Sequence, residues 1–430
     1  MTNSTAAELQ IDADRLWRDL MELAGITEPE RPYTRRSFSA QFLQGRDWLA
    51  ERYRAAGLSV RIDAGGNLIG RLPGTRDGAP AIMIGSHSDS VPGGGRFDGI
   101  AGVVAALEIA RTLSSGGASL AHPLEVVDFL AEEPSEFGLS CIGSRAMAGA
   151  LDASHLALTG PGQETLAAAI ERVGGAPGRI DAARRADVHA FLELHIEQGP
   201  LLESSRVDVG IVTGIVGIAR IEIRLVGEAA HAGTAPMSAR RDAAVAAAQV
   251  ILAVRDLART MDARGDGYFV ATCGVVGILP GASNVVPGEA RIVIDARSES
   301  APLMQRFLDE IGPRAADIAQ ASGVALERFE LVSRNPPTAC DGALQEVLRE
   351  SAAQTGCSAM SMASGAGHDA AFVARIAPAA MLFVPCRNGR SHCPEEWTEP
   401  SELALGARVL LQAVRRIDGA PYGATQRRQP

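Results

Sequence analysis

Hydrophobic and polar positions follow two periods along the chain, and the first 200 residues have the pattern of an α/β sheet. Apolar residues recur at helical spacing over 12–24 and 39–55, where Asp12 and Ser37 are candidate N-caps. Short apolar runs bounded by glycine predict buried strands at 58–62, 67–72 and 81–84, and further apolar runs predict strands at 124–130 and 190–194. Strands of this kind, alternating with amphipathic helices, predict a sheet covered by helices on both faces.

The pattern changes near residue 212. The segment 218–226 alternates, with its apolar residues on one face, and is followed by predicted helices at 239–261 and 302–323 and strands at 269–276 and 290–296. Short strands interleaved with two helices are typical of a small α+β domain of the ferredoxin-like kind. We therefore predict an α/β catalytic domain of residues 1–211 and 331–430, interrupted by a smaller domain at 212–330. The last residues, 422–430, are expected to fray.

Composition narrows the choice of partners and compartment. The net charge of −10 argues against nucleic acid, because a polyanion needs a basic face. The six cysteines are scattered without a CxxC pair, which favours reduced thiols in a cytosolic protein. Neither a signal peptide nor an apolar run approaching the roughly 20 residues of a membrane span is visible, so we expect a cytoplasmic protein with no membrane partner.

Side chains that bind metals gather where the predicted strands end. In open α/β sheets, ligands bind beyond the carboxyl ends of the strands. Two imidazoles, a bridging carboxylate and further ligands would hold two divalent ions about 3.5–4 Å apart. The candidate ligands are His87, Asp98, Glu133, His195 and His392. Any one of these histidines alone would more often be structural, and adjacent glutamates are usually a solvated helix face; the combination is what points to metal.

Glu132 is the carboxylate that this set leaves free. It stands next to Glu133 at the end of a predicted strand, so the two neighbouring side chains can point at different targets. Burial and neighbouring carboxylates are expected to raise the pKa of Glu132, while nearby cations oppose the rise. We expect Glu132 to take a proton from the attacking water.

Seven motifs in chain order, between about residues 60 and 400, carry a family resemblance. They are GSHSDSVPGGGRFDGIAGV, FLAEEPSEFG, ELHIEQGPLLE, VGEAAHAGTAPM, SNVVPGEARIVIDAR, SGAGHDAAFVA and FVPCRNGRSHCPEEW. Together they resemble the carbamoylase and allantoate amidohydrolase branch of the dinuclear aminoacylase/carboxypeptidase-type metallopeptidases. The histidine of HIEQG, at position 195, resembles this branch rather than the peptidases. The resemblance implies an inserted domain that serves in dimerisation or as a lid, and a homodimer.

The resemblance also implies metal-binding roles. Asp98 would bridge two divalent ions, Zn²⁺ or Mn²⁺. His87 and His195 would complete one site, and Glu133 and His392 the other. Glu132 would act as general base and then as general acid towards the leaving nitrogen.

Other motifs resemble substrate-binding groups. His231 resembles a residue that reaches the partner subunit's active site and steadies the oxyanion; alternatively, it is a packed histidine after a strand. Asn284 and Arg291 resemble the groups that bind the substrate carboxylate, since a guanidinium can pair with both of its oxygens; Arg291 could instead be an exposed strand residue. Gln198 resembles an amide that contacts the ureido or carboxylate group, with a purely structural role as the alternative.

A glycine-rich loop over 365–369 resembles a pocket lining, with Gly367 facing substrate. His368 in that loop is expected beside the ligands rather than among them. His122, His155 and His189 have unremarkable sequence contexts, and no role is assigned to them.

One departure from the family pattern concerns the substrate. Relatives commonly carry an Arg-Phe pair after the paired glutamates, whereas this chain has Glu136-Phe137. The expected reaction is hydrolysis of the ureido C–N bond of an N-carbamoyl amino acid or related ureido acid, a small carboxylate-bearing substrate. Hydrolysis of N-acyl amino acids or dipeptides at the same site, or a catalytically silent binding protein of this fold, are the alternatives. The exact substrate, its stereochemistry and the physiological metal stay open.

Overall fold

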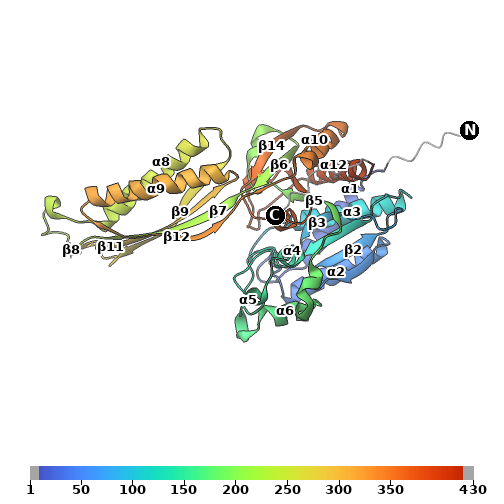
Figure 1. Ribbon diagram of the computed structural model, residues 1–430, viewed down its shortest axis with the longest axis horizontal. Helices are drawn as coiled ribbons and strands as arrows, with labels where there is room; N and C mark the ends of the chain where they lie inside the picture. Colours follow the sequence, from blue (N-terminus) through green and yellow to red (C-terminus); the bar gives the residue numbers. More distant parts are fainter. Residues whose placement is uncertain (1–8, 420–430) are drawn as a thin grey trace, which may run out of the picture. The chain divides into compact units, whose positions relative to one another are not determined.

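The computed structural model describes residues 9–419, which divide into two compact units (Figure 1). The first takes in the chain up to Thr213, Cys340–Met362, and the described residues from His368 onward. The second consists of Gly214–Ala339 and Ala363–Gly367. The predicted tail at 422–430 lies outside the described residues. Each unit has its own sheet.

A mixed sheet forms the centre of the first unit. Its strands follow the order β1-β2-β4-β3-β5-β15-β6-β13, and β14 also pairs with β6. The central strands β4, β3, β5 and β15 are parallel, so their carboxyl ends lie along one edge. The bounds are β1 (Ser59–Ile62), β2 (Leu68–Leu72), β3 (Ala81–His87), β4 (Leu124–Phe129), β5 (Val188–Ile196), β6 (Val209–Ile215), β13 (Thr338–Ala339), β14 (Ala359–Ser364) and β15 (Ala379–Val384).

Helices flank this sheet, which confirms the predicted fold class. Helix α3 packs on β3, and α1, α10 and α12 join it in one helical group, while α2 packs on β1 and β2. The helices are α1 (Ala13–Gly25), α2 (Ala40–Ala55), α3 (Ile100–Ser115), α4 (Ile142–Met147), α5 (Ala153–Leu156), α6 (Leu166–Arg172), α7 (Leu201–Ser205), α10 (Gly342–Gln354), α11 (Ala370–Val373) and α12 (Pro400–Gly419). Short 3₁₀ turns are η1 (Pro161–Gln163), η2 (Pro177–Ala183), η3 (Met237–Ala239) and η4 (Arg387–Gly389).

The two predicted helix caps have different outcomes. Asp12 caps α1, because its carboxylate accepts a hydrogen bond from the backbone N–H of Arg15 at 2.9 Å. Ser37 does not cap α2, and Ser39 does, accepting from the N–H of Phe42 at 3.1 Å. The reason is local: Phe38 has φ of 67°, a left-handed conformation from which a helix cannot start.

The second unit has the ferredoxin-like order β-α-β-β-α-β. Its sheet runs β12-β7-β11-β9, entirely antiparallel, with α8 and α9 on one face (Figure 1). Apolar residues of β7 and β11 face these helices, whereas the intervening charged residues point to the opposite face. The elements are β7 (Gly217–Val226), β8 (Ala230–His231), α8 (Ala243–Asp262), β9 (Phe269–Leu279), β10 (Val285–Val286), β11 (Glu289–Ser298), α9 (Ala301–Ala321) and β12 (Ala325–Asn335).

Strand β12 continues beyond residue 330, the predicted end of the insertion. Within residues 9–419, no helix is long and apolar enough to cross a membrane.

Candidate metal centre

The predicted metal ligands come together at the carboxyl edge of the first unit's sheet. His87 is the last residue of β3, and His195 is the penultimate residue of β5. Glu133 follows β4 after a short turn, Asp98 lies two residues before the start of α3, and His392 lies in the loop before α12. All are buried except His392, which is 48% exposed. Parallel strands therefore bring residues that are far apart in the chain to one place.

Asp98 lies at the centre of the cluster, and its two oxygens face different groups. Its Oδ1 is 3.5 Å from His87 Nε2 and 3.0 Å from His195 Nε2. Its Oδ2 is 2.9 Å from His392 Nε2, which in turn lies 3.3 Å from a carboxylate oxygen of Glu133. The ligand atoms of each group, His87–Asp98–His195 and Asp98–Glu133–His392, lie within 4.8 Å of one another. Each oxygen of Asp98 thus faces a separate pair of the predicted ligands.

Two histidines are held with Nε2 directed at Asp98. His87 Nδ1 lies 3.0 Å from the carbonyl oxygen of Asp89, and His195 Nδ1 lies 2.9 Å from that of Ile196. A proton held on Nδ1 by a carbonyl leaves the Nε2 lone pair available for a metal. Gly99 is required beside them: it has φ of 66°, and a Cβ there would come within 2.4 Å of the His87 ring.

Charge crowding shifts the acid–base equilibria of the cluster. Burial lowers the pKa of His87, but the carboxylates of Glu132 and Asp89 outweigh it and raise that pKa well above its usual value. Burial favours the neutral form of Asp98, yet its histidine neighbours hold the pKa of Asp98 well below its usual range. Hydrogen bonds to Asp98 and Glu133 raise the pKa of His392 to about 11. The carboxylates thus stabilise the protonated form of His87 and His392, and the histidines stabilise the ionised form of Asp98.

Glu132 lies beside the cluster and is 8% exposed. Its Oε2 is 3.7 Å from His87 Nε2, and its backbone N–H, like that of Glu133, donates to the carboxylate of Asp89. Burial raises the pKa of Glu132 well above its usual value, and Glu133 adds to the rise while His87 opposes it. A carboxyl group whose pKa is raised by burial is suited to general acid–base chemistry.

The donor set fits divalent metal ions. Glu132 lies beside the cluster, and two further buried carboxylates, Glu193 and Asp369, lie behind it, so that with them the carboxylates outnumber the three imidazoles of the ligand set. Buried negative charge needs a compensating cation. Imidazole with carboxylate is the ligand set of Zn²⁺ and related transition ions. The chemistry of these residues therefore fits divalent metal ions.

His368 lies against the cluster from the side of His195. The two rings are 4.6 Å apart between centroids, and Glu193 completes a third buried group with them. Burial lowers the pKa of His368 well below its usual value, and His195 lowers it further. His368 therefore lies beside the predicted ligand His195.

Gln198 is brought into the cluster as well. Its side-chain amide donates to Asp98 Oδ2 at 2.8 Å, and its Nε2 is 3.4 Å from His392 Nε2. Its backbone has φ of 58°. Gln198 therefore contacts the same oxygen of Asp98 as His392 does.

The remaining predicted substrate-binding residues belong to the second unit. His231 is exposed on β8, and its Nδ1 accepts a hydrogen bond from the N–H of Gly233 at 3.1 Å. The carbonyl of Asn284 accepts from the N–H of Ala232 at 2.9 Å, which places Asn284 beside His231. Gly367 is exposed, and a Cβ added there would meet no atom within 4 Å.

Arg291 lies on the charged face of β11. Its guanidinium donates two hydrogen bonds to Glu222 of the neighbouring strand β7. Glu222 is also 3.3 Å from a guanidinium nitrogen of Arg328 on β12. The Arg291 side chain is 49% exposed, so its guanidinium is accessible to solvent although it is already paired with Glu222.

Two residues of the centre had no role in the sequence prediction. Asp89 anchors the backbone of the paired glutamates, and its place two residues after His87 in one motif is a signal that would have found it. Glu396 accepts hydrogen bonds from the N–H groups of Phe97 and Asp98. Burial raises the pKa of Glu396 to about 7.

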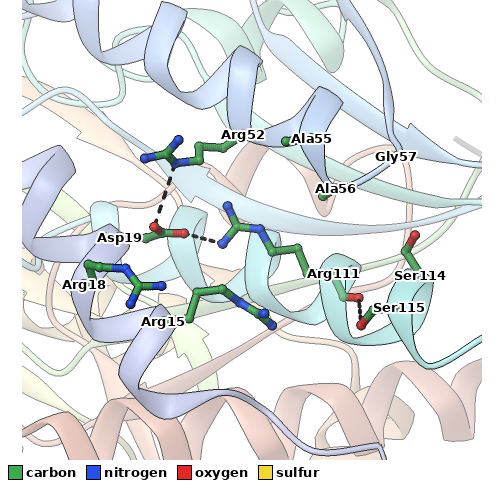
Figure 2. Close-up of a pocket in the computed structure, with 10 residues that line it drawn as sticks. All are labelled: Arg15, Arg18, Asp19, Arg52, Ala55, Ala56, Gly57, Arg111, Ser114 and Ser115. Carbon is green, nitrogen blue, oxygen red and sulfur yellow. Dashed lines mark hydrogen bonds and ion pairs between the residues drawn. The ribbon is translucent and has the colours of Figure 1, made fainter.

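A cavity of about 550 Å³ lies elsewhere in the first unit, among α1, α2 and α3. Figure 2 shows four arginines around a buried aspartate there: Arg15, Arg18, Arg52, Arg111 and Asp19. None of the predicted site residues lines this cavity.

Comparison with known proteins gives matches over most of the chain. The model of peptidase family M20/M25/M40 matches residues 83–416. An N-carbamoyl-L-amino-acid amidohydrolase of Paenarthrobacter aurescens is 39% identical over 94% of this chain and 98% of its own. A ureidoglycolate hydrolase of Oryza sativa subsp. japonica is 36% identical over 95% of this chain and 85% of its own. A hydantoinase/carbamoylase family amidase from Burkholderia multivorans has 34% identity and a TM-score of 0.88, covering 96% and 99%.

These matches cover nearly the whole chain, and the chain belongs to peptidase family M20/M25/M40. It is a hydrolase, and within the family it falls in the branch of carbamoylases and allantoate amidohydrolases, as the sequence motifs predict.

Proposed function

We propose that this protein hydrolyses the ureido C–N bond of an N-carbamoyl amino acid or a related ureido acid, using two divalent ions such as Zn²⁺ or Mn²⁺. The observation that carries the proposal is Asp98, whose two oxygens each face a separate set of ligands, with Glu132 left free beside them. Relatives named for N-carbamoyl amino acids and for ureidoglycolate support the ureido substrate class.

In the proposed mechanism, each residue of the centre has one task. Divalent ions held by His87, Asp98, His195, Glu133 and His392 would supply a nucleophilic water and polarise the ureido carbonyl. Glu132 takes the proton of the water and later returns it to the leaving nitrogen. Cleavage releases ammonia, and the remaining carbamate loses CO2 to give the free amino group. Gln198, in hydrogen-bond contact with Asp98, is available to orient the ureido group.

Three residues of the second unit are proposed to hold the substrate, on the strength of their motifs. Arg291 and Asn284 would bind its carboxylate, and His231 would donate to the oxyanion as it forms. Gly367 would line the same pocket. Because Arg291 already holds Glu222, the substrate carboxylate must displace that partner.

The substrate class is tested by incubating the protein, loaded with Mn²⁺ or Zn²⁺, with carbamoyl amino acids, carbamoyl-β-alanine, allantoate and N-acetyl amino acids. We expect ammonia from one or more ureido acids and none from the acetyl compounds, whose cleavage would instead release an amino acid without ammonia. Chelated protein is the control. Turnover of the acetyl compounds alone would refute a ureido hydrolase.

We further propose a cytoplasmic homodimer in which His231 serves the partner's site. The six cysteines are all free, which fits a reducing compartment. Glu132→Gln and His231→Ala are each expected to be inactive alone. A mixed dimer has one site with both Glu132 and the partner's His231, so subunit exchange should restore about one quarter of wild-type activity. If mixed dimers are shown to form and no activity is recovered, the shared site is refuted.

A further inference from the structure

Glu396 is a fully buried carboxylate that joins two loops of the metal centre. One oxygen accepts hydrogen bonds from the N–H groups of Phe97 at 2.8 Å and Asp98 at 3.0 Å. The other accepts from the hydroxyl of Ser391 at 2.7 Å. The first loop carries Asp98, and the second carries His392. A single side chain therefore joins the backbone of the Asp98 loop to the Ser391 side chain of the His392 loop.

The surrounding residues hold Glu396 in this position. A Cβ on Gly95 would come within 1.8 Å of the Glu396 carboxylate, so only glycine admits it. The next residue, Trp397, packs edge-on against Phe97 with 5.5 Å between ring centroids. The guanidinium of Arg96 lies over Trp397 on one side and over Tyr33 on the other. The 95–98 loop and the 396–397 segment are thus packed as one piece.

The two halves of the metal centre differ in how they are supported. His87 and His195 sit at the ends of strands inside the central sheet, where the ladder of hydrogen bonds fixes them. His392 lies in a loop, with φ of 55°, a conformation that non-glycine residues rarely adopt. Such a backbone persists only where its surroundings hold it. Ser391, next to it, is bonded to Glu396.

We propose that Glu396 is a positioning residue that sets Asp98 and His392 in register, so that binding at the Asp98–Glu133–His392 group depends on it while the His87–Asp98–His195 group depends on it less. This inference rests on the proposed two-metal function. Partners that orient metal ligands typically change metal affinity by about 10- to 100-fold when removed.

Metal titration tests the proposal directly. Mn²⁺ binding to metal-free protein is followed by calorimetry for the wild type, Glu396→Ala and Glu395→Gln. Glu395 is exposed and pairs with Arg390, so its variant removes the same charge one residue away. We expect Glu396→Ala to weaken one of the two binding steps by about 10- to 100-fold and the other much less, and Glu395→Gln to match the wild type.

Two further variants separate positioning from general damage. In Glu396→Gln, the amide oxygen still accepts from both N–H groups and the amide nitrogen can donate to Ser391, so metal binding should recover. Ser391→Ala removes the hydroxyl that links Glu396 to the His392 loop, together with its longer contacts to Asp98 Oδ2 at 3.5 Å and to Gln198 at 3.4 Å. This variant should fold even if Glu396→Ala does not, and it should weaken the same binding step. Wild-type binding of both ions by Glu396→Ala, equal loss of both ions, or unchanged binding in Ser391→Ala would each overturn the proposal.

A measurement without metal keeps this inference separate from the proposed function. Amide hydrogen exchange at Phe97 and Asp98 should be faster in metal-free Glu396→Ala than in metal-free wild type, because both N–H groups lose their acceptor. Unchanged exchange would overturn the positioning role. If the wild type takes up no metal, the proposed function fails, and the exchange result still decides whether Glu396 holds the loop.

Discussion

The first unit contains two clusters of buried charge, and they are built on opposite principles. At the cavity of Figure 2, the buried carboxylate of Asp19 accepts a hydrogen bond from Arg111 and lies 3.8 Å from Arg52. Arg15, which also lines the cavity, donates two hydrogen bonds of 2.8 Å to the buried carboxylate of Glu108. At the metal centre, carboxylates are grouped with one another and with imidazoles, which carry charge only when protonated.

This difference shows what separates a structural charge cluster from a functional one. The arginine cluster is balanced by the protein itself and ties three helices together. The metal centre is balanced only by protons or by added cations, and the raised pKa values of His87 and His392 express that demand. Both clusters contain several buried charged groups, but only in the arginine cluster do guanidinium groups offset the buried carboxylates. Three predictions put this contrast to the test.

The largest effect is expected from removing the shared carboxylate. Asp98→Ala should bind neither ion at wild-type affinity and show no activity above metal-free protein, because both ligand groups lose a donor. Metal content after dialysis and ammonia release are the measurements. Asp77→Ala, at an exposed loop position, is the control. Two tightly bound ions in Asp98→Ala would remove the basis for calling this cluster the functional one.

The next effect concerns catalysis without metal binding. Glu132→Gln should retain both ions but lose about 10²–10⁴-fold in kcat, since the amide cannot accept the proton of water. Metal content and kcat are measured on the same preparation, with the exposed Glu171→Gln as control. Normal turnover would show that another group is the base, and loss of metal would place Glu132 among the ligands.

The smallest effect is expected at the arginine cluster, and it is one of stability. Asp19→Ala leaves Arg111, itself largely buried, without its closest partner and should lower the free energy of unfolding by about 1–3 kcal/mol. Arg18→Ala should change it by no more than about 0.5 kcal/mol, because exposed Arg18 makes no ion pair with any described residue. Urea unfolding and kcat are the measurements. A loss of kcat in folded Asp19→Ala would show that the arginine cluster is not purely structural.

Much of the first unit follows from the sequence because most of its strands are short apolar runs, although β1, predicted as buried, is mostly exposed. The five strands predicted between residues 58 and 194 are all present, and the metal-ligand candidates all lie at one edge of the sheet. Strand β12 escaped prediction because it is exposed on most of its length, so no alternation marks it. Exposure removes the periodic signal on which strand prediction depends.

The supporting residues of the centre were harder to find than the ligands. Glu396 bonds to the backbone of Asp98 across 298 residues, and a backbone N–H leaves no trace in the identity of its own residue. The ligands, by contrast, are recognisable because metal chemistry restricts them to a few residue types. The pairing of Arg291 with Glu222 was likewise invisible, since it depends on the register of two strands.

Under the proposed function, that pairing makes substrate binding an exchange of one carboxylate for another at Arg291. A carboxylate bound at Arg291 would take the place of Glu222, and Glu222 would keep the guanidinium of Arg328, 3.3 Å away. The arginine would then pass from one anion to another, and the glutamate would retain a counter-charge. A neutral ligand would offer nothing in return for the broken ion pair. The Glu222 pairing would in this way favour acids among the substrates.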